Sequence, residues 1–184
     1  MEHEIVAGLA QDESFVDGAM PPDAASLFKD PSSRPDYAVA VEGKGEGGGA
    51  GGEQQWLRPE EKIVAGQRPS AELFLEEVCG GNVVQGTMDD RWFLGALAAV
   101  AAHPAGLLDN LFVSCDHWKT HGVITSRFFK DGEWLEVVVD TLVPVNEHGT
   151  PVYGRCADGG QHWVQLLEKA YAKLHGRCVR GDVW

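Results

Sequence analysis

Two segments of the chain carry apolar residues at the spacing of an α-helix. Residues 91–104 are apolar on almost every side, and this pattern predicts a buried helix at the centre of the fold. Asp89 or Asp90 is suited to cap its N-terminus, and Pro104 marks its far end. The helical spacing is carried by Trp92, Leu94, Leu97, Ala98 and Ala101.

The second segment, residues 162–176, has its apolar residues on one face only. Glu168 and Lys169 fall outside this stripe, and Gly176 is typical of the residue that follows a helix. The pattern therefore predicts an amphipathic helix docked on the core. Its apolar stripe comprises Trp163, Leu166, Leu167, Ala170, Tyr171 and Leu174.

Two β-rich runs, residues 122–129 and 133–140, lie between these helices. Asp131 and Gly132 separate the runs and favour the positive φ angles of a tight hairpin turn, so we expect two antiparallel strands. Helices combined with a local hairpin are typical of the α+β class, here with a small antiparallel sheet.

The composition divides the chain into two parts. Residues 1–70 hold most of the prolines and the glycine run of residues 43–52, which buries no apolar surface and is expected to be flexible. We therefore expect an extended N-terminal arm followed by a folded part, residues 71–184. Within the folded part, residues 71–78 favour a short helix and the glycines of residues 80–86 favour a loop.

Charge and cysteine content restrict the classes of function. The formal net charge of −13, without a dense cluster of Lys and Arg, argues against nucleic acid or an anionic membrane as the partner. The sequence shows no signal segment and no apolar run of membrane-spanning length. The cysteines lack CxxC spacing, which is typical of reduced thiols, so we expect a cytoplasmic protein without membrane insertion. They are Cys79, Cys115, Cys156 and Cys178.

Five segments between Phe15 and Gly176 form an ordered set of motifs. They are FVDGAMPPDAASLF, WLRPEEKI, QGTMDDRWFLGALAAVAAHP, RFFKDGEWLEVVVDTLVPV and HWVQLLEKAYAKLHG. Together they resemble the first half of the calpain-type cysteine protease core. The resemblance implies a papain-like first subdomain, mostly helical, whose buried central helix begins at the nucleophile.

The resemblance also assigns site residues. The family pattern is approximately Q-G-x-x-G-D-C-W, so Gln85 matches the oxyanion-hole glutamine, while Arg91 stands in place of the catalytic cysteine and Asp89 in place of a glycine. A cysteine suits a helix N-terminus because the positive end of the helix dipole stabilises its thiolate. A guanidinium is always protonated and is not a nucleophile, so we expect no functional catalytic residue.

Two further family features are expected to be missing. The resemblance places the histidine and asparagine of the triad in a following subdomain, and it places two acidic calcium ligands where this chain has Asn82 and Gln161. Both side chains keep an oxygen but lack the negative charge on which calcium affinity depends, so we expect no metal and no cofactor. The histidines that match no catalytic position are His103, His117, His121, His148, His162 and His175.

Residues 115–121, CDHWKTH, place His117 and His121 four residues apart. This spacing suits either a metal clip on a helix or a surface loop, and the β-rich run that follows favours the loop. Three tryptophans of the predicted helices and strands are expected in the core, because tryptophan side chains are usually largely buried. They are Trp92, Trp134 and Trp163.

These observations favour a catalytically inactive, calpain-like protein that acts as a binding, adaptor or regulatory module in the cytoplasm. Protein partners are expected, either cytoskeletal or calpain-related, and the cytoskeletal association rests on family resemblance alone. Two alternatives stay open. In the first, the chain is a truncated fragment of a longer calpain-type protease, because it stops shortly after the last motif. In the second, it is an enzyme of unrelated chemistry that uses Asp89, Asp90 or a free cysteine.

Overall fold

The computed structural model of the protein describes residues 2–23, 26, 55–61, 71–74, 83–86, 90–145 and 149–176. Helices and antiparallel sheets are both present there, which confirms the α+β class, but the finer expectation of a mostly helical subdomain is not supported. Within these ranges, no helix is long and apolar enough to cross a bilayer. The elements are α1 (Glu2–Ala7), β1 (Gln55–Leu57), the 3-10 helix η1 (Pro59–Glu61), β2 (Val83–Val84), α4 (Arg91–Ala101), the 3-10 helix η3 (Asp109–Leu111), β3 (Phe112–Ser114), β4 (Val123–Lys130), β5 (Glu133–Asp140), β6 (Val143–Val145), β7 (Arg155–Cys156) and α5 (Trp163–Leu174).

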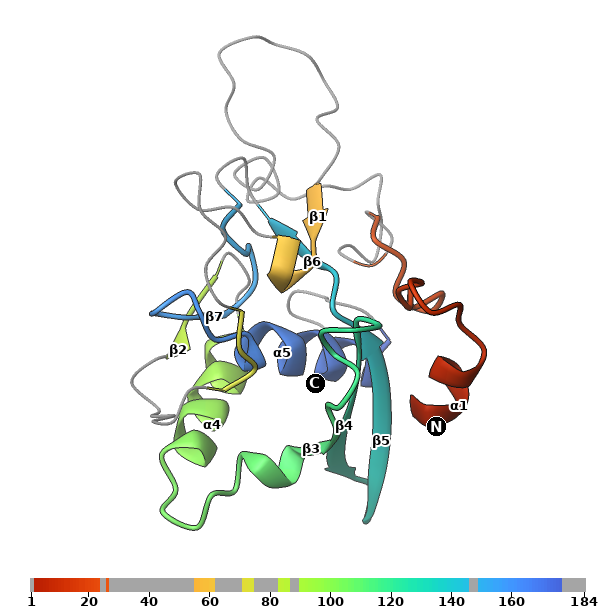
Figure 1. Cartoon of the computed structure of the whole chain (residues 1–184). Coiled ribbons are helices and arrows are strands. Elements are labelled where there is room, and N and C mark those ends of the chain that lie inside the picture. Colours follow the sequence, from red (N-terminus) through yellow and green to blue (C-terminus); the bar gives the residue numbers. More distant parts are fainter. Residues whose placement is uncertain are drawn as a thin grey trace, which may run out of the picture.

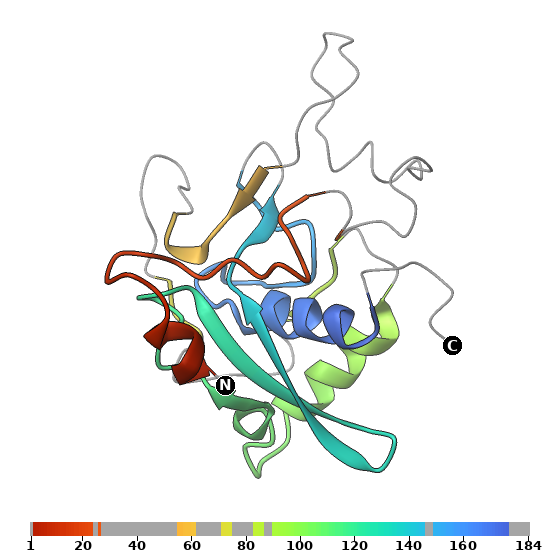
Figure 2. The same ribbon diagram turned by 90° about the vertical axis from the view of Figure 1, so that its right-hand side faces the viewer.

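The central helix of the fold is α5, and the prediction that α4 would be buried and central is wrong. Figure 1 shows α5 between α4 and the β4–β5 hairpin, and Figure 2 views the molecule from the side on which the hairpin lies. Nine of the twelve residues of α5 are buried, whereas α4 buries only Phe93, Leu94 and Leu97. The sequence of α4 suggested burial because hydrophobicity scales count alanine and glycine as apolar, although both are small enough to be exposed at little cost.

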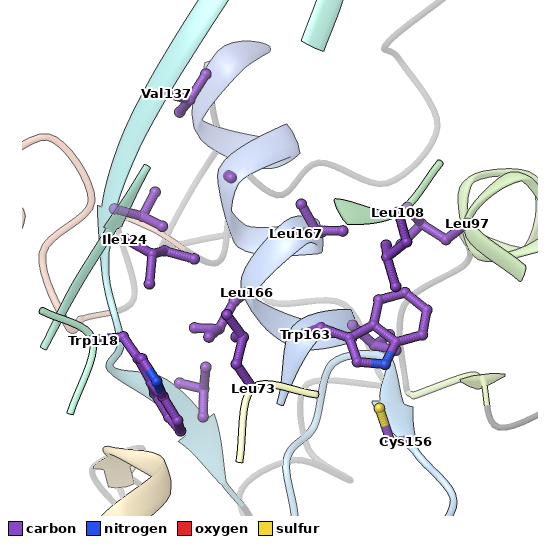
Figure 3. Close-up of a cluster of buried hydrophobic side chains, with 14 of the residues drawn as sticks. Leu73, Leu97, Leu108, Trp118, Ile124, Val137, Cys156, Trp163, Leu166 and Leu167 are labelled. Atoms are coloured by element: carbon purple, nitrogen blue, oxygen red, sulfur yellow. The ribbon is translucent and has the colours of Figure 1, made fainter. Parts of the chain in front are cut away.

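The hydrophobic core surrounds α5. Figure 3 shows core side chains from several elements, including Leu97 of α4, Ile124 of β4 and Cys156 of β7. Trp163 is fully buried, as predicted, but Trp92 is 50% exposed and Trp134 is 55% exposed, so the core assignment of these two tryptophans is wrong.

The predicted hairpin is confirmed. Strands β4 and β5 pair antiparallel along their full length, and β3 adds a third strand on the far side of β4. The turn between β4 and β5 has φ angles of 53° at Asp131 and 89° at Gly132, which is the left-handed geometry that the Asp-Gly pair favours.

Two short antiparallel pairs, β1 with β6 and β2 with β7, complete the described sheets. The β2 strand corrects the prediction of a loop over residues 80–86, because Val83 and Val84 form a ladder with β7. Glu72 forms an isolated bridge with Gln161, so the first residues of the helix predicted for residues 71–78 are not helical. The rest of that segment and the glycine run of residues 43–52 lie outside the described residues.

A buried ionic network joins α5 to the sheet and to the N-terminal residues. Lys169 Nζ donates to Asp140 Oδ1 at 2.5 Å and to the Leu142 carbonyl at 2.7 Å. Asp17 donates its backbone N–H to Asp140 Oδ2 at 2.7 Å and accepts a hydrogen bond from Lys173 Nζ at 2.6 Å. Lys169 lies outside the apolar stripe and was therefore expected away from the buried face of the helix. It is buried instead, because Asp140 on β5 compensates its charge.

Candidate functional site

Arg91 and Gln85, which the sequence resemblance matched to the nucleophile and oxyanion-hole positions, lie next to each other. Gln85 directly follows β2, in which Val84 pairs with Arg155 of β7. Arg91 is the first residue of α4, and its Nε donates a hydrogen bond to Gln85 Oε1 at 2.7 Å. Arg155 Nη1 donates to the backbone oxygen of Gln85 at 3.5 Å. The β2–β7 pair and the start of α4 therefore bring these three residues together.

The Arg91 side chain offers no group that attacks a carbonyl. Its guanidinium stays protonated, and its bond to Gln85 occupies the side-chain oxygen of that residue. A positive side chain at a helix N-terminus costs roughly 0.3–1 kcal/mol when it is exposed, as Arg91 is. This position can recognise a hydrogen-bond acceptor but cannot act as the nucleophile.

Asp90 and Glu168 form a carboxyl pair behind Arg91 that the sequence analysis missed. Asp90 occupies the N-cap position of α4, as predicted, but its side chain makes no capping hydrogen bond. Burial raises the pKa of Glu168 well above its usual range, and the charge of Asp90 raises it further. The helical spacing hinted at the burial of Glu168, because this residue lies one turn from both Val164 and Ala172, which are apolar and buried. Asp89 lies outside the described residues.

The described thiols are poorly suited to nucleophilic chemistry. Burial raises the pKa of Cys156 to about 12. Burial and the charge of Asp116 raise the pKa of Cys115. Because the thiolate is the reactive form, both groups are less reactive than a free cysteine near neutral pH. This disfavours the alternative of thiol-based chemistry at either position.

Gln161, which the sequence resemblance matched to a calcium position, is buried and bonded to a neighbouring carboxylate. Asp158 accepts hydrogen bonds from Gln161 Nε2 at 2.6 Å and from the backbone N–H groups of Gly160 and Gln161. Asp158 therefore brings a negative charge close to this position, but its oxygens already serve the loop. Asn82 lies outside the described residues, so the pairing of these two positions stays a prediction.

Millimolar calcium is expected to leave the melting temperature of the protein almost unchanged, because Asn82 and Gln161 supply no carboxylate. Ligand linkage stabilises a protein by about 2.7 kcal/mol at a hundredfold excess over Kd and by almost nothing below Kd. Scanning calorimetry with and without calcium measures the shift. The variant Asn82→Asp/Gln161→Glu is expected to show a larger shift, and a strong calcium response of the unmodified protein would contradict the prediction.

Residues 115–121 form a series of turns beside α1, not a helix. The rings of His117 and His121 have centroids 5.7 Å apart, and His3 of α1 contacts His117 edge to face at 5.4 Å. His121 Nδ1 lies 3.0 Å from the Glu13 carbonyl oxygen. No three metal-ligating side chains converge on one point in the part of the chain that the structure describes. The turns confirm the loop form of the segment.

Comparison with known proteins gives one consistent family. The family model described as calpain family cysteine protease matches residues 15–180. Calpain-type cysteine protease ADL1 of Oryza sativa subsp. japonica is 32% identical over 168 residues, which cover 90% of this chain and 7% of that protein. Calpain-5 of Caenorhabditis elegans is 31% identical over 170 residues, covering 89% of this chain and 22% of that protein. Calpain-10 of Mus musculus is 37% identical over 125 residues, or 66% of this chain and 18% of that protein. The chain thus spans less than a quarter of the length of each of these relatives.

Proposed function

The chain belongs to the calpain family of cysteine proteases, and we propose that it is a non-catalytic member that acts by binding protein partners. The proposal is carried by Arg91, which the family resemblance matches to the nucleophile position and which donates a hydrogen bond to Gln85. A guanidinium in that place removes covalent catalysis even if every other part of a protease is supplied.

Support for the binding role comes from the surface beside Arg91. Trp92 is 50% exposed and packs edge to face against Tyr171 of α5, so part of a large aromatic side chain faces solvent. Aromatic and arginine side chains are enriched at protein interfaces. We propose a cytoplasmic adaptor or regulatory module, with calpain-related or cytoskeletal proteins as partners.

A second candidate function is that of a segment within a longer calpain-type protein. This alternative is favoured by the lengths of the relatives, because the matched region is only 7% of ADL1 and 22% of calpain-5. Under this alternative, the inactive site belongs to a larger molecule and the binding role is shared with other domains. The intact mass of the endogenous protein distinguishes the two candidates, since a mass well above 19.9 kDa supports the longer protein.

Arg91→Cys is expected to create an alkylatable thiol without peptidase activity in the 184-residue chain. The helix dipole favours the thiolate, but no residue of the chain matches the family's catalytic histidine, and loss of the base from such a triad costs several orders of magnitude in kcat. Mass spectrometry after iodoacetamide treatment and a fluorogenic peptide assay measure the two properties.

The decisive assay adds the second protease half of an active relative in trans. Activity is expected with Arg91→Cys and not with the unmodified protein, because only the variant carries a nucleophile. Binding of the added half, followed by size-exclusion chromatography, controls for failure to assemble. Peptide turnover by the unmodified chain with its partner half would refute the non-catalytic assignment.

A further inference from the structure

Glu168 lies at a junction of three elements in the interior of the protein. It comes from the middle of α5 and is 6% exposed. Its Oε2 accepts a hydrogen bond from the backbone N–H of Gly154 at 2.6 Å, in the segment that leads into β7. Its carboxyl group also meets the side chain of Asp90, the residue that precedes α4. One buried side chain thus connects α5, α4 and the β7 segment.

Two carboxylates at such close range repel each other when both are ionised, because little water is present to screen them. Asp90 Oδ1 is buried, and no donor of the described residues reaches it. Asp90 also makes no capping bond to α4. A proton on Glu168 removes the repulsion and supplies the missing donor.

No cation in the described structure is placed to replace that proton. Arg91 on α4 and Arg155 on β7 both direct their hydrogen bonds to Gln85. Lys169, next to Glu168 on α5, is bonded to Asp140. Desolvation and the charge of Asp90 are the main influences on the Glu168 carboxyl group, and both raise its pKa.

We propose that Glu168 keeps a proton in the folded protein and donates it in a hydrogen bond to Asp90, and that removal of this proton loosens the first turn of α4 from α5 and Gly154. This turn carries Arg91, so the pair couples the order of the candidate site to pH. The proposal does not rest on the protein being non-catalytic. The direction is fixed by linkage: the folded state holds the proton more tightly than the unfolded chain, so stability from this pair is complete below the ordinary glutamate pKa and is lost as pH rises.

Glu168→Gln tests the proposal because glutamine imitates the protonated acid. Its Oε1 can accept from Gly154 while its Nε2 donates to Asp90, and it does not titrate. Urea unfolding is measured from pH 5 to pH 9 for the unmodified protein, Glu168→Gln and the control Glu133→Gln, an exposed glutamate in the hairpin. The unfolding constant of the unmodified protein relative to Glu168→Gln is expected to rise by up to about tenfold per pH unit. Glu133→Gln is expected to follow the unmodified protein.

Hydrogen exchange of the first turn of α4, corrected for the intrinsic effect of pH, measures the loosening directly. Exchange is expected to accelerate with pH in the unmodified protein and not in Glu168→Gln. Parallel pH curves for these two proteins would overturn the proposal. If Glu168→Gln does not fold, carboxyl ¹³C NMR of the unmodified protein decides the question. One glutamate that titrates well above the others supports the protonated Glu168, and titration of every glutamate in the ordinary range overturns the proposal.

Discussion

Asp140→Ala is expected to destabilise the protein by about 3–5 kcal/mol, because it leaves the ammonium group of Lys169 buried without its counter-ion. Lys169 and Asp140 have side chains that are 1% and 0% exposed, and their charged atoms are 2.5 Å apart. Asp140 also accepts the backbone N–H groups of Asp17 and Leu142. Since a typical domain has a free energy of unfolding of about 5–15 kcal/mol, this single change removes a large part of the stability of the fold.

A double-mutant cycle separates the ion pair from its surroundings. Lys169→Met is expected to cost a similar amount, because it leaves the Asp140 carboxylate buried and unpaired, whereas Asp140→Ala/Lys169→Met should cost clearly less than the two single changes together. Lys119→Met is the matched control, because Lys119 pairs with Glu72 at the surface and should lose less than about 1 kcal/mol. Urea unfolding followed by circular dichroism gives these values. A cost below about 1 kcal/mol for Lys169→Met would mean that the buried pair does not hold α5 on the sheet.

The β4–β5 hairpin could be predicted from the sequence because its information is local. Asp131 and Gly132 favour the turn, and the flanking runs of apolar and β-branched residues specify the strands. The extent of α5 was predictable for the same reason, with Gly176 just past its end at a φ of 92°. These features require only interactions between residues that are close in the chain.

The burial of charged residues on α5 could not be predicted from the helical pattern alone. Lys169 looks exposed by its residue type, and its burial depends on Asp140, which lies 29 residues earlier in the chain. Glu168 depends in the same way on Asp90 and Gly154. Hydrophobic periodicity carries no information about such partners, so a helix with paired charges appears more amphipathic in sequence than it is in structure.

The sequence resemblance nominated the residues of the candidate site, but it could not give their arrangement. Resemblance alone identified Arg91 and Gln85, since no periodic pattern singles out either residue. That the arginine would donate to the glutamine, and that Arg155 would contact the same residue, follows from the β2–β7 pairing. A two-residue strand within a glycine-rich segment gives too short a pattern to be recognised, so this geometry required the structure.

Gly86→Ala is expected to destabilise the protein by about 1–3 kcal/mol, the usual range for an overpacked interior, and Gly95→Ala to stabilise it. A Cβ atom at Gly86 would overlap backbone atoms of Val152 and Tyr153, and Tyr153 is fully buried, so neither side can move away easily. A Cβ at Gly95 meets no other atom within 4 Å, and Gly95 lies in the exposed face of α4. Alanine there should add about 0.5–1 kcal/mol, because glycine loses more chain entropy in a helix.

Both substitutions add the same methyl group, so the difference between their stability changes reports the space around each glycine. Gly86 follows Gln85, and we therefore expect Gly86→Ala also to weaken the contact between Gln85 and Arg91, while Gly95→Ala preserves it. Thermal unfolding gives the two stability changes, and the NMR shift of Arg91 Nε–H follows the contact at the site. A Gly86→Ala variant as stable as the unmodified protein would mean that the loop after β2 does not pack on Val152 and Tyr153, and that the candidate site is held by α4 alone.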